Sequence, residues 1–171
     1  LTSIIKGRRK HLLGVFDDQG DTQGATGYYT KTRTATKFIE MIDSSTAARR
    51  NLHLKRTADM NDREWANMLQ TEKSLQIQMK QLASYWMGLS HYERENYQVA
   101  ANWFQNRCLD PWPDGPWTHS ARYNLARCHE AMGEYEKARK LYLIDESPQR
   151  HGCLLRARRL DRLSEASPEK D

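Results

Sequence analysis

The clearest pattern of hydrophobic and polar positions begins at Asn61, where apolar residues start to recur three or four positions apart. That spacing keeps side chains on one face of an α-helix. Asn61 followed by Glu64 forms a capping box, in which the two residues satisfy each other's backbone N–H groups. We expect one long helix, or two helices joined near Thr71. Its apolar positions are Trp65, Met68, Leu69, Leu75, Met79, Leu82, Ala83, Trp86 and Leu89.

Helical patterns continue toward the C-terminus and are separated by strong breaking signals. The loop 110–117 contains three prolines, which exclude a helix there. Thr118 is a candidate N-cap for the next helix, and Gly133 fits the left-handed position just after its end. Ser147-Pro148 predicts a cap and a first helical position. We therefore expect helices over 97–109, 119–132, 135–143 and 148–163, followed by a disordered tail at 164–171.

The N-terminal residues 1–60 show a weaker pattern. Glycines interrupt the first apolar segment, and Ser and Thr residues mark a break near residue 45. We expect an irregular helical extension here. Its candidate helices are 1–16, 25–32, 36–42 and the basic stretch 47–55, with a turn-rich loop between the first two.

An internal repeat of 38 positions runs through the C-terminal half. Small residues align with small ones and aromatic residues with aromatic ones. A small residue in the first helix of each hairpin, Gly88 or Ala126, is expected to meet Ala100 or Ala138 in the second and bring the two helices close together. The aligned pairs are Tyr85 with Tyr123, Gly88 with Ala126, His91 with His129, Tyr97 with Tyr135, Ala100 with Ala138, and Phe104 with Tyr142.

One helical hairpin leaves an apolar face open, so hairpins of this kind stack. Phe104 and Tyr142 are expected to fill the space between units. The pattern predicts an all-α protein built from antiparallel helix hairpins, with a repeat domain at 61–163.

These residues resemble the tetratricopeptide-repeat (TPR) family. Tyr85-Trp86-Met87-Gly88 through Phe104 is similar to one unit, and Tyr123 through Tyr142 is similar to a second. The segment Gly133-Glu134-Tyr135 is similar to the family's Gly-Asp-Tyr turn. The resemblance covers about residues 75–163 and excludes 1–60. It implies a short right-handed solenoid with units at about 75–109 and 119–143 and a C-terminal capping helix at 148–163.

A narrower likeness is to TPR modules of bacterial cell-envelope assembly factors. It rests on Tyr85-Trp86-x-Gly88, the proline-containing loop and the closing segment Ala157 to Leu160. It implies association with the cell envelope and favours the periplasm or envelope over the cytoplasm. Because residue 1 is Leu, we also expect sequence to precede it in the parent protein.

The TPR resemblance implies that the concave face binds a peptide or protein segment. Asn124 and Arg127 are similar to a family arrangement that holds a peptide's C-terminal carboxylate, although the partnering lysines are absent. Alternatively, Tyr85 and Tyr123 only pack against the long helix. The candidate binding residues are Tyr85, Leu89, Tyr92, Tyr123, Asn124 and Arg127, with Leu82, Ser120 and Glu130 at further groove positions.

Other conspicuous side chains favour structural roles. His91 and His129 occupy equivalent repeat positions, where packing is the expected function. Trp112 and Trp117 are expected to fold back over the hairpin ends, although exposed aromatic residues also anchor partners. The three cysteines, Cys108, Cys128 and Cys153, fall within helical apolar patterns, where a free Cys behaves as a small buried residue.

No motif in the sequence indicates catalysis. Close metal-ligand pairs, a phosphate-binding loop and a nucleophile elbow are all missing. We therefore expect a non-catalytic protein with no metal or cofactor. An accessory domain of a larger enzyme is an alternative that the sequence leaves open.

Charge leaves a second alternative open. The 171 residues carry a formal net charge of +5, concentrated at the two ends. The basic ends fit nucleic acid or an anionic membrane or envelope polymer. A solvated helix face is the expected interpretation, and nucleic acid is not the expected partner. No apolar run reaches the length of a membrane span. The C-terminal cluster consists of Arg150, Arg156, Arg158, Arg159 and Arg162.

Overall fold

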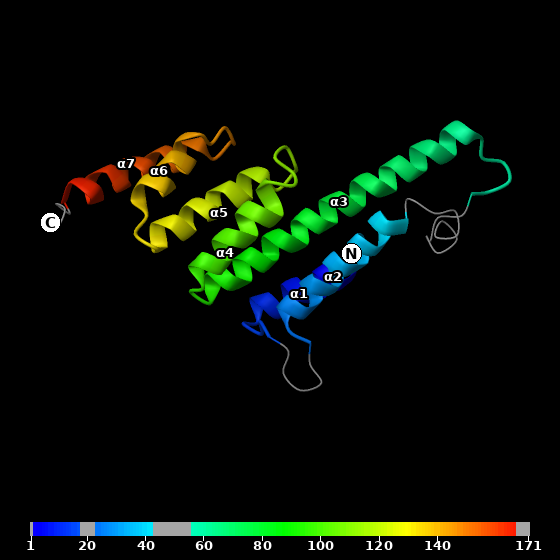
Figure 1. Ribbon diagram of the computed structural model, residues 1–171, viewed down its shortest axis with the longest axis horizontal. Coiled ribbons are helices and arrows are strands. Elements are labelled where there is room, and N and C mark those ends of the chain that lie inside the picture. Colours follow the sequence, from blue (N-terminus) through cyan, green and yellow to red (C-terminus); the bar gives the residue numbers. More distant parts are fainter. Residues whose placement is uncertain (1, 18–22, 43–55, 167–171) are drawn as a thin grey trace. The chain divides into compact units, whose positions relative to one another are not determined.

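The structure is a computed structural model that describes residues 2–17, 23–42 and 56–166. All regular secondary structure in these ranges is helical, so the all-α prediction is confirmed (Figure 1). The predicted 47–55 segment lies outside the described residues. The helices are α1 (Thr2–Leu12), α2 (Ala25–Ile42), α3 (Asp62–Glu93), α4 (Tyr97–Phe104), the π-helical turn η2 (Gln105–Leu109), α5 (Thr118–Ala131), α6 (Tyr135–Leu143) and α7 (Arg150–Ala166).

The chain divides into two compact units, Leu1–Ala83 and Ser84–Asp171. The division falls inside α3, whose last turns belong to the second unit. Each unit is described by itself. The candidate site lies entirely in the second.

In the first unit, α1 and α2 form a hairpin in which Gly7 of α1 lets the two helices pack closely. A Cβ atom on Gly7 would lie 2.5 Å from a ring carbon of Tyr29, so only glycine fits there without a shift. Tyr29 is fully buried. The His11 ring contacts Phe16 edge-on at a centroid distance of 5.3 Å. The first helix ends at Leu12, earlier than the predicted residue 16.

The two short helices predicted over 25–32 and 36–42 are one continuous helix, α2. Threonine is a weak helix former because its hydroxyl competes for backbone groups. Here the Thr32 hydroxyl donates to the Tyr28 carbonyl one turn earlier, at 3.0 Å, without breaking the helix. The predicted interruption is therefore wrong.

The start of α3 agrees with the predicted capping box. The Glu64 backbone N–H donates to Asn61 Oδ1 at 2.9 Å, and the Asn61 N–H donates to a Glu64 carboxylate oxygen at 3.0 Å. The alternative of two helices joined near Thr71 is wrong, because α3 continues through this residue without a break. The Thr71 hydroxyl donates to the Asn67 carbonyl one turn earlier.

The second unit contains two cores, and the first lies among the end of α3, α4, η2 and α5. It consists of buried apolar residues with no polar side chain among them. A Cβ atom on Gly88 would lie 2.6 Å from a ring carbon of Phe104. The three atoms nearest to that position all belong to Phe104, so the ring, rather than the expected Ala100, occupies the space that Gly88 leaves. The buried members are Ala100, Ala101, Phe104, Cys108, Leu109, Ala121, Leu125 and Cys128.

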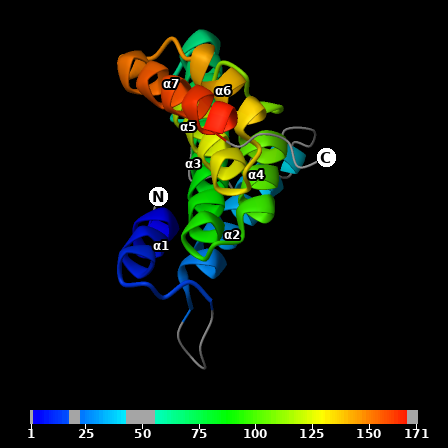
Figure 2. The ribbon, with the colours of Figure 1, turned by 90° about the vertical axis from the view of Figure 1, so that its left-hand side faces the viewer.

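The second core joins α5, α6 and α7. Figure 2 shows these helices from the left-hand side of Figure 1. Ala126 and Ala138 belong to the same buried cluster, in agreement with the predicted pairing of small residues. Helix α7 completes this core by adding Cys153, Ala157 and Leu160. Without α7, the apolar side of the α5–α6 hairpin would face water.

Several helix ends differ from their predictions. Thr118 does not cap α5, because its hydroxyl donates to the Trp112 carbonyl at 2.9 Å, and Trp117 occupies the N-cap position. Gly133 follows the end of α5 with φ +76°, which confirms its left-handed conformation. Helix α7 begins at Arg150, after a turn in which the Ser147 hydroxyl accepts from the Gln149 N–H. It extends to Ala166, so the start of the predicted disordered tail is helical.

Candidate functional site

A pocket of about 520 Å³ lies against α5 in the second unit. We call it the Asn124 pocket. Five of the six predicted binding residues line it: Tyr85, Leu89, Tyr123, Asn124 and Arg127. The first turn of α5, the loop between α6 and α7, and the start of α7 supply the rest of the wall. The other lining residues are His119, Ser120, Asp145, Ser147, Pro148, Gln149 and Cys153.

Asn124 organises this pocket. It is buried, and its amide nitrogen donates to the Tyr85 hydroxyl at 3.1 Å and to the Ser120 carbonyl at 2.9 Å. Its amide oxygen accepts from the Arg127 guanidinium at 3.0 Å. An Asn side chain has two N–H donors, and both are used. Asn124 therefore orients Tyr85 and Arg127. The polar groups still available for new hydrogen bonds belong to the residues around it.

Arg127 is the charged group of the pocket. Its guanidinium carbon lies 4.3 Å from the centre of the Tyr92 ring, a cation–π contact. Among the described residues, no carboxylate forms an ion pair with Arg127. Its guanidinium has five N–H donors, and Asn124 accepts from only one of its nitrogens. Arg127 thus offers a fixed positive charge with several donors still unused.

Tyr85 forms an aromatic wall. Its ring stacks on Trp117 at a centroid distance of 5.3 Å and contacts Phe104 at 5.9 Å. Trp117 therefore folds back onto the hairpin, as predicted. Burial raises the pKa of Tyr85, and the hydrogen bond from Asn124 and the charge of Arg127 only partly oppose that shift. The phenol stays neutral, and its hydroxyl is held at the pocket surface.

Tyr92, the sixth predicted residue, lines a neighbouring pocket of about 340 Å³. We call this one the arginine pocket. Arg127 lines both pockets and so marks where they adjoin. The arginine pocket lies between α5 and α7, and its other lining residues are Glu130, Ala131, Tyr135, Arg156, Arg159 and Leu163.

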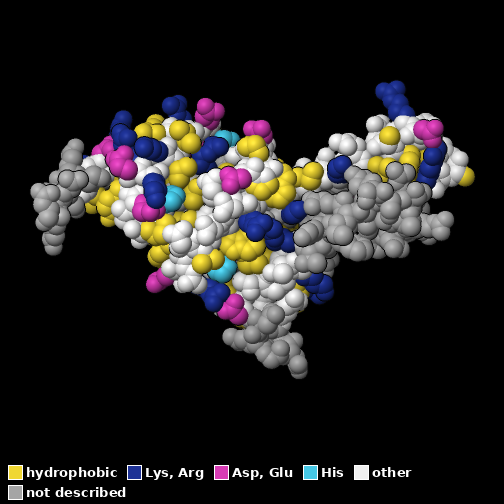
Figure 3. Space-filling view, in the orientation of Figure 1, with side chains coloured by type: hydrophobic (Ala, Val, Ile, Leu, Met, Phe, Trp, Pro, Cys, Tyr) yellow, Lys and Arg dark blue, Asp and Glu magenta, His cyan; other side chains and the backbone are white. Residues whose placement is uncertain are grey.

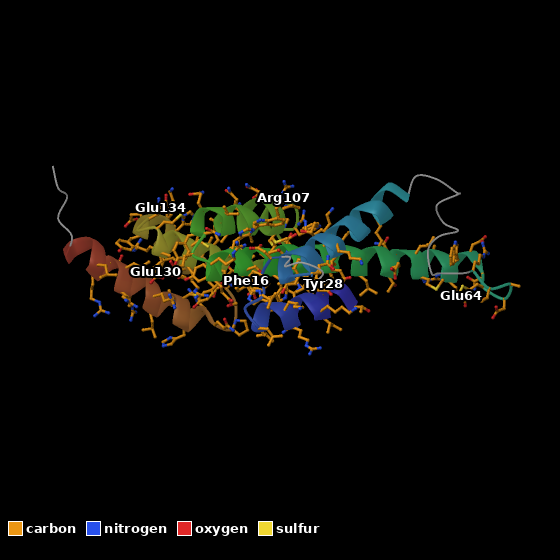
Figure 4. The ribbon with its side chains drawn as sticks, turned by 90° about the horizontal axis from the view of Figure 1, so that it is seen from below. Phe16, Tyr28, Glu64, Arg107, Glu130 and Glu134 are labelled. Atoms are coloured by element: carbon orange, nitrogen blue, oxygen red, sulfur yellow. The ribbon has the colours of Figure 1, made fainter. Side chains whose placement is uncertain are left out.

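Glu130, on α5, connects the polar groups of the arginine pocket through hydrogen bonds (Figure 4). One of its carboxylate oxygens accepts from the Tyr142 hydroxyl and from the Arg156 guanidinium, each at 2.9 Å. Arg156 also lies 5.6 Å from the centre of the Tyr123 ring. Arg156 is therefore neutralised and fixed by protein groups, and it differs in this from Arg127.

A buried acid, Asp145, also lines the Asn124 pocket. Burial of Asp145 disfavours its charge, but hydrogen bonds from Ser147 and Cys153 outweigh that cost and lower its pKa. The Ser147 hydroxyl donates to it at 2.8 Å, and His119 Nδ1 lies 3.5 Å away. Asp145 therefore stays ionised and fixes the α6–α7 loop that closes the pocket.

The cysteines are not arranged for nucleophilic chemistry. All three are free and buried, as predicted. Burial raises the pKa of Cys128 to about 12, and burial with the nearby Asp145 carboxylate raises that of Cys153 to about 11. Only the thiolate is a strong nucleophile, so these thiols are inert near neutral pH.

The histidines that align in the repeat make structural contacts. The His91 ring stacks on Trp103 at a centroid distance of 6.5 Å. His129 Nδ1 lies 2.5 Å from a carboxylate oxygen of Glu134. Both contacts fit the structural role expected at these positions: a ring stack for His91 and a polar contact for His129. Within the described ranges, no three His, Cys, Asp or Glu side chains gather in a way that suits a metal ion.

Comparisons of the chain with protein-family models, with curated proteins and with solved structures found no match. In the part of the chain that the structure describes, no helix combines the length and hydrophobicity needed to cross a bilayer.

The arginine pocket as a unit was not predicted from the sequence. Tyr92, Arg127 and Glu130 were expected on the groove, and Arg156 and Arg159 were expected on the solvated face of a terminal helix. Twenty-six positions separate Glu130 from Arg156. Only the packing of α7 against α5 and α6 brings the two groups together. The Arg cluster on the predicted terminal helix was the one available signal.

Proposed function

We propose that the second unit is a TPR-like pair of helix hairpins with a closing helix, and that it binds a carboxylate-bearing peptide segment in the Asn124 pocket. The observation that carries this proposal is the state of Arg127. Its guanidinium is oriented by Asn124 and Tyr92, and no carboxylate of the described chain pairs with it. An arginine fork of this kind suits a carboxylate, which it binds through two parallel hydrogen bonds.

Pre-orientation supports a binding role for Arg127. A free arginine side chain loses rotamer freedom when it binds, which lowers affinity. Here the stack on Tyr92 and the hydrogen bond to Asn124 have already restricted the guanidinium. Tyr85 and Leu89 supply an aromatic and an apolar wall beside the charge. Such a combination of fixed polar groups and apolar walls is typical of ligand sites.

The dimensions support an extended ligand. The Asn124 pocket of about 520 Å³ adjoins the arginine pocket of about 340 Å³ at Arg127. A segment of several residues that crosses Arg127 would place side chains in both. This arrangement supports a peptide over a single small molecule. The protein's part in this proposal is binding and orientation, with no bond made or broken.

Peptide arrays test the proposal. Randomised hexapeptides are displayed in two sets, one with a free C-terminal carboxylate and one with a C-terminal amide, and are probed with the labelled full chain. We expect retention of peptides that carry a free or side-chain carboxylate, and weaker retention of amidated peptides that lack acidic residues. Equal retention of all peptides, or of none, would contradict the proposal.

Two arginines of α5 provide a matched pair of variants. Arg127→Gln should abolish the carboxylate preference, whereas Arg122→Gln removes the same charge from a residue that lines neither pocket. Tyr123 also lines the Asn124 pocket, but Tyr123→Ala would not test binding alone. The Tyr123 ring packs against the second core, with its centroid 5.8 Å from that of Tyr142, so its loss would also destabilise the fold. In thermal unfolding, Arg122→Gln should match the parent chain, whereas Arg127→Gln should stay folded with a somewhat lower melting temperature, because it loses the contacts to Asn124 and Tyr92.

A further inference from the structure

We infer that the arginine pocket binds a phosphomonoester group carried by the same peptide. This inference rests on the proposed peptide-binding function and adds a second anchoring point to it. The pocket is lined by three guanidinium groups and one carboxylate, so its lining carries an excess of positive charge. Two tyrosine rings, one alanine and one leucine complete the walls.

The positive charges of this pocket are unequal. Glu130 neutralises Arg156 and fixes it at 2.9 Å. Arg127 and Arg159 have no ion-pair partner among the described residues, and they come from two different helices, α5 and α7. Arg127 is held over Tyr92, while Arg159 is exposed and free to adjust. The site therefore presents one fixed and one adjustable guanidinium to a ligand that enters between the helices.

A phosphomonoester matches this pair better than a carboxylate does. Near neutral pH it carries close to two negative charges and three acceptor oxygens. Two guanidinium forks can then each bind it through two oxygens. A single carboxylate has two oxygens and one charge, which Arg127 alone satisfies. A phosphorylated Ser, Thr or Tyr next to the segment in the Asn124 pocket would supply the group.

The shape of the site favours a side chain over a nucleic-acid backbone or a membrane. Lys and Arg side chains lie over α6 and α7, with Asp and Glu side chains among them (Figure 3). Arg158 and Arg162 are exposed on α7 but do not line the pocket. A duplex or a bilayer would engage the exposed arginines together. A pocket with Tyr92 and Tyr135 in its walls instead selects a single group that enters it.

Titrations with small anions test this inference without a known peptide. Phenyl phosphate and phenyl sulfate have the same shape and three terminal oxygens, but the sulfate ester carries only one negative charge. Binding of each to the full chain is measured at pH 7.5 by NMR or calorimetry, with inorganic phosphate as a third ligand. We expect phenyl phosphate to bind about tenfold more tightly than phenyl sulfate, because the second guanidinium pairs only with the dianion. Equal affinities, or no binding of phenyl phosphate, would overturn the inference.

Variants on α7 separate the pocket from diffuse charge. Arg159→Gln should weaken phenyl phosphate binding about tenfold, the effect of one lost charge-assisted contact. Arg158→Gln makes the same charge change on the neighbouring residue and should leave the affinity within about twofold. Equal losses in both variants would identify a diffuse basic surface of the kind that binds nucleic acid or anionic lipid, and would overturn the pocket.

A third variant should act in the opposite direction. Glu130→Gln removes the negative charge of the pocket, while its amide oxygen can still accept from Tyr142 and Arg156. Phenyl phosphate should then bind more tightly, and unchanged or weaker binding would contradict the inference. Failure here is distinguishable from failure of the peptide proposal. Unphosphorylated carboxylate peptides depend on Arg127 alone, so they should bind the Arg159→Gln variant as they bind the parent chain.

Discussion

The two cores of the second unit are built from the same repeat, yet they differ at one aligned position. Phe104 fills the first core among apolar neighbours, and a glycine makes room for its ring. Tyr142 fills the second core, where its hydroxyl donates to Glu130. Glu130 in turn fixes Arg156 on α7.

The hydroxyl group of Tyr142 therefore links the second core to Glu130, whereas Phe104, at the aligned position, has no polar group to make such a link. The buried members of the first core are all apolar, and Tyr85, Leu89 and Tyr92 of the pocket walls pack against them. The second joins packing to a chain of polar contacts that reaches the surface between α5 and α7.

Removal of the Phe104 ring should have the largest effect on this comparison. Phe104→Ala is expected to lower the free energy of unfolding by about 3–5 kcal/mol, because the ring is fully buried and a cavity would remain. Urea unfolding followed by circular dichroism measures the loss. Val99→Ala, an exposed apolar residue on the same helix, should change stability by less than about 1 kcal/mol. Similar effects for both variants would mean that the first core is not closed.

Two glycines test the close contact on which the first core depends. Gly88→Ala should destabilise the protein by about 1–3 kcal/mol, because its Cβ would lie 2.6 Å from the Phe104 ring. Gly152→Ala in α7 should stabilise it by about 0.5–1 kcal/mol, because that Cβ meets nothing within 4 Å and alanine favours a helix. Chemical unfolding of the two variants gives both values. A stabilising Gly88→Ala would show that Phe104 does not occupy this space.

The reciprocal exchange of Phe104 and Tyr142 should have unequal effects. Phe104→Tyr brings a hydroxyl into an apolar core and should cost about 1–3 kcal/mol if that group finds no partner. Tyr142→Phe removes one hydrogen bond from Glu130 and should cost about 1 kcal/mol. Thermal and urea unfolding measure both costs. A Phe104→Tyr cost clearly smaller than the Tyr142→Phe cost would show that the first core is not the more apolar of the two.

Titration of the buried thiols should have the smallest effect on stability, because it changes nothing near neutral pH. The pKa of Cys128 is raised to about 12 and that of Cys153 to about 11, from an ordinary value of 9.0. A raised thiol pKa means that the folded state favours the neutral form. The associated stability is therefore present below pH 9 and is lost as the pH rises from 9 toward 11–12. Urea unfolding between pH 7 and 11 should show this decline, and Cys153→Ala should reduce its slope.

Local signals in the sequence predicted most of the helices in the second unit. The bounds of α6 agree with the prediction, and Gly133 ends the preceding helix as expected. These features depend on residues close together in the chain. The errors arose where a side chain had competing partners. Thr118 has the chemistry of an N-cap, but the folded loop offers its hydroxyl the Trp112 carbonyl instead.

The part of the candidate site that depends on helix periodicity was predicted from the sequence. Five of the six proposed residues share the Asn124 pocket because they occupy one face of each first helix of the repeat. Tyr92 was placed beside Arg127 but belongs to the neighbouring pocket. The role of Asn124 as an orienting group depends on Tyr85, 39 positions away. No periodicity reveals such a contact.

The most direct test of the account is an NMR titration of the labelled full chain with a carboxylate peptide retained by the array. We predict the largest shifts at the Arg127 side-chain Nε–H, the Asn124 side-chain amide and the Tyr85 ring. Resonances of Trp103 and Arg107, which line a separate shallow pocket on α4 and η2, should stay unchanged. Shifts confined to Trp103 and Arg107 would place the ligand elsewhere and contradict the account.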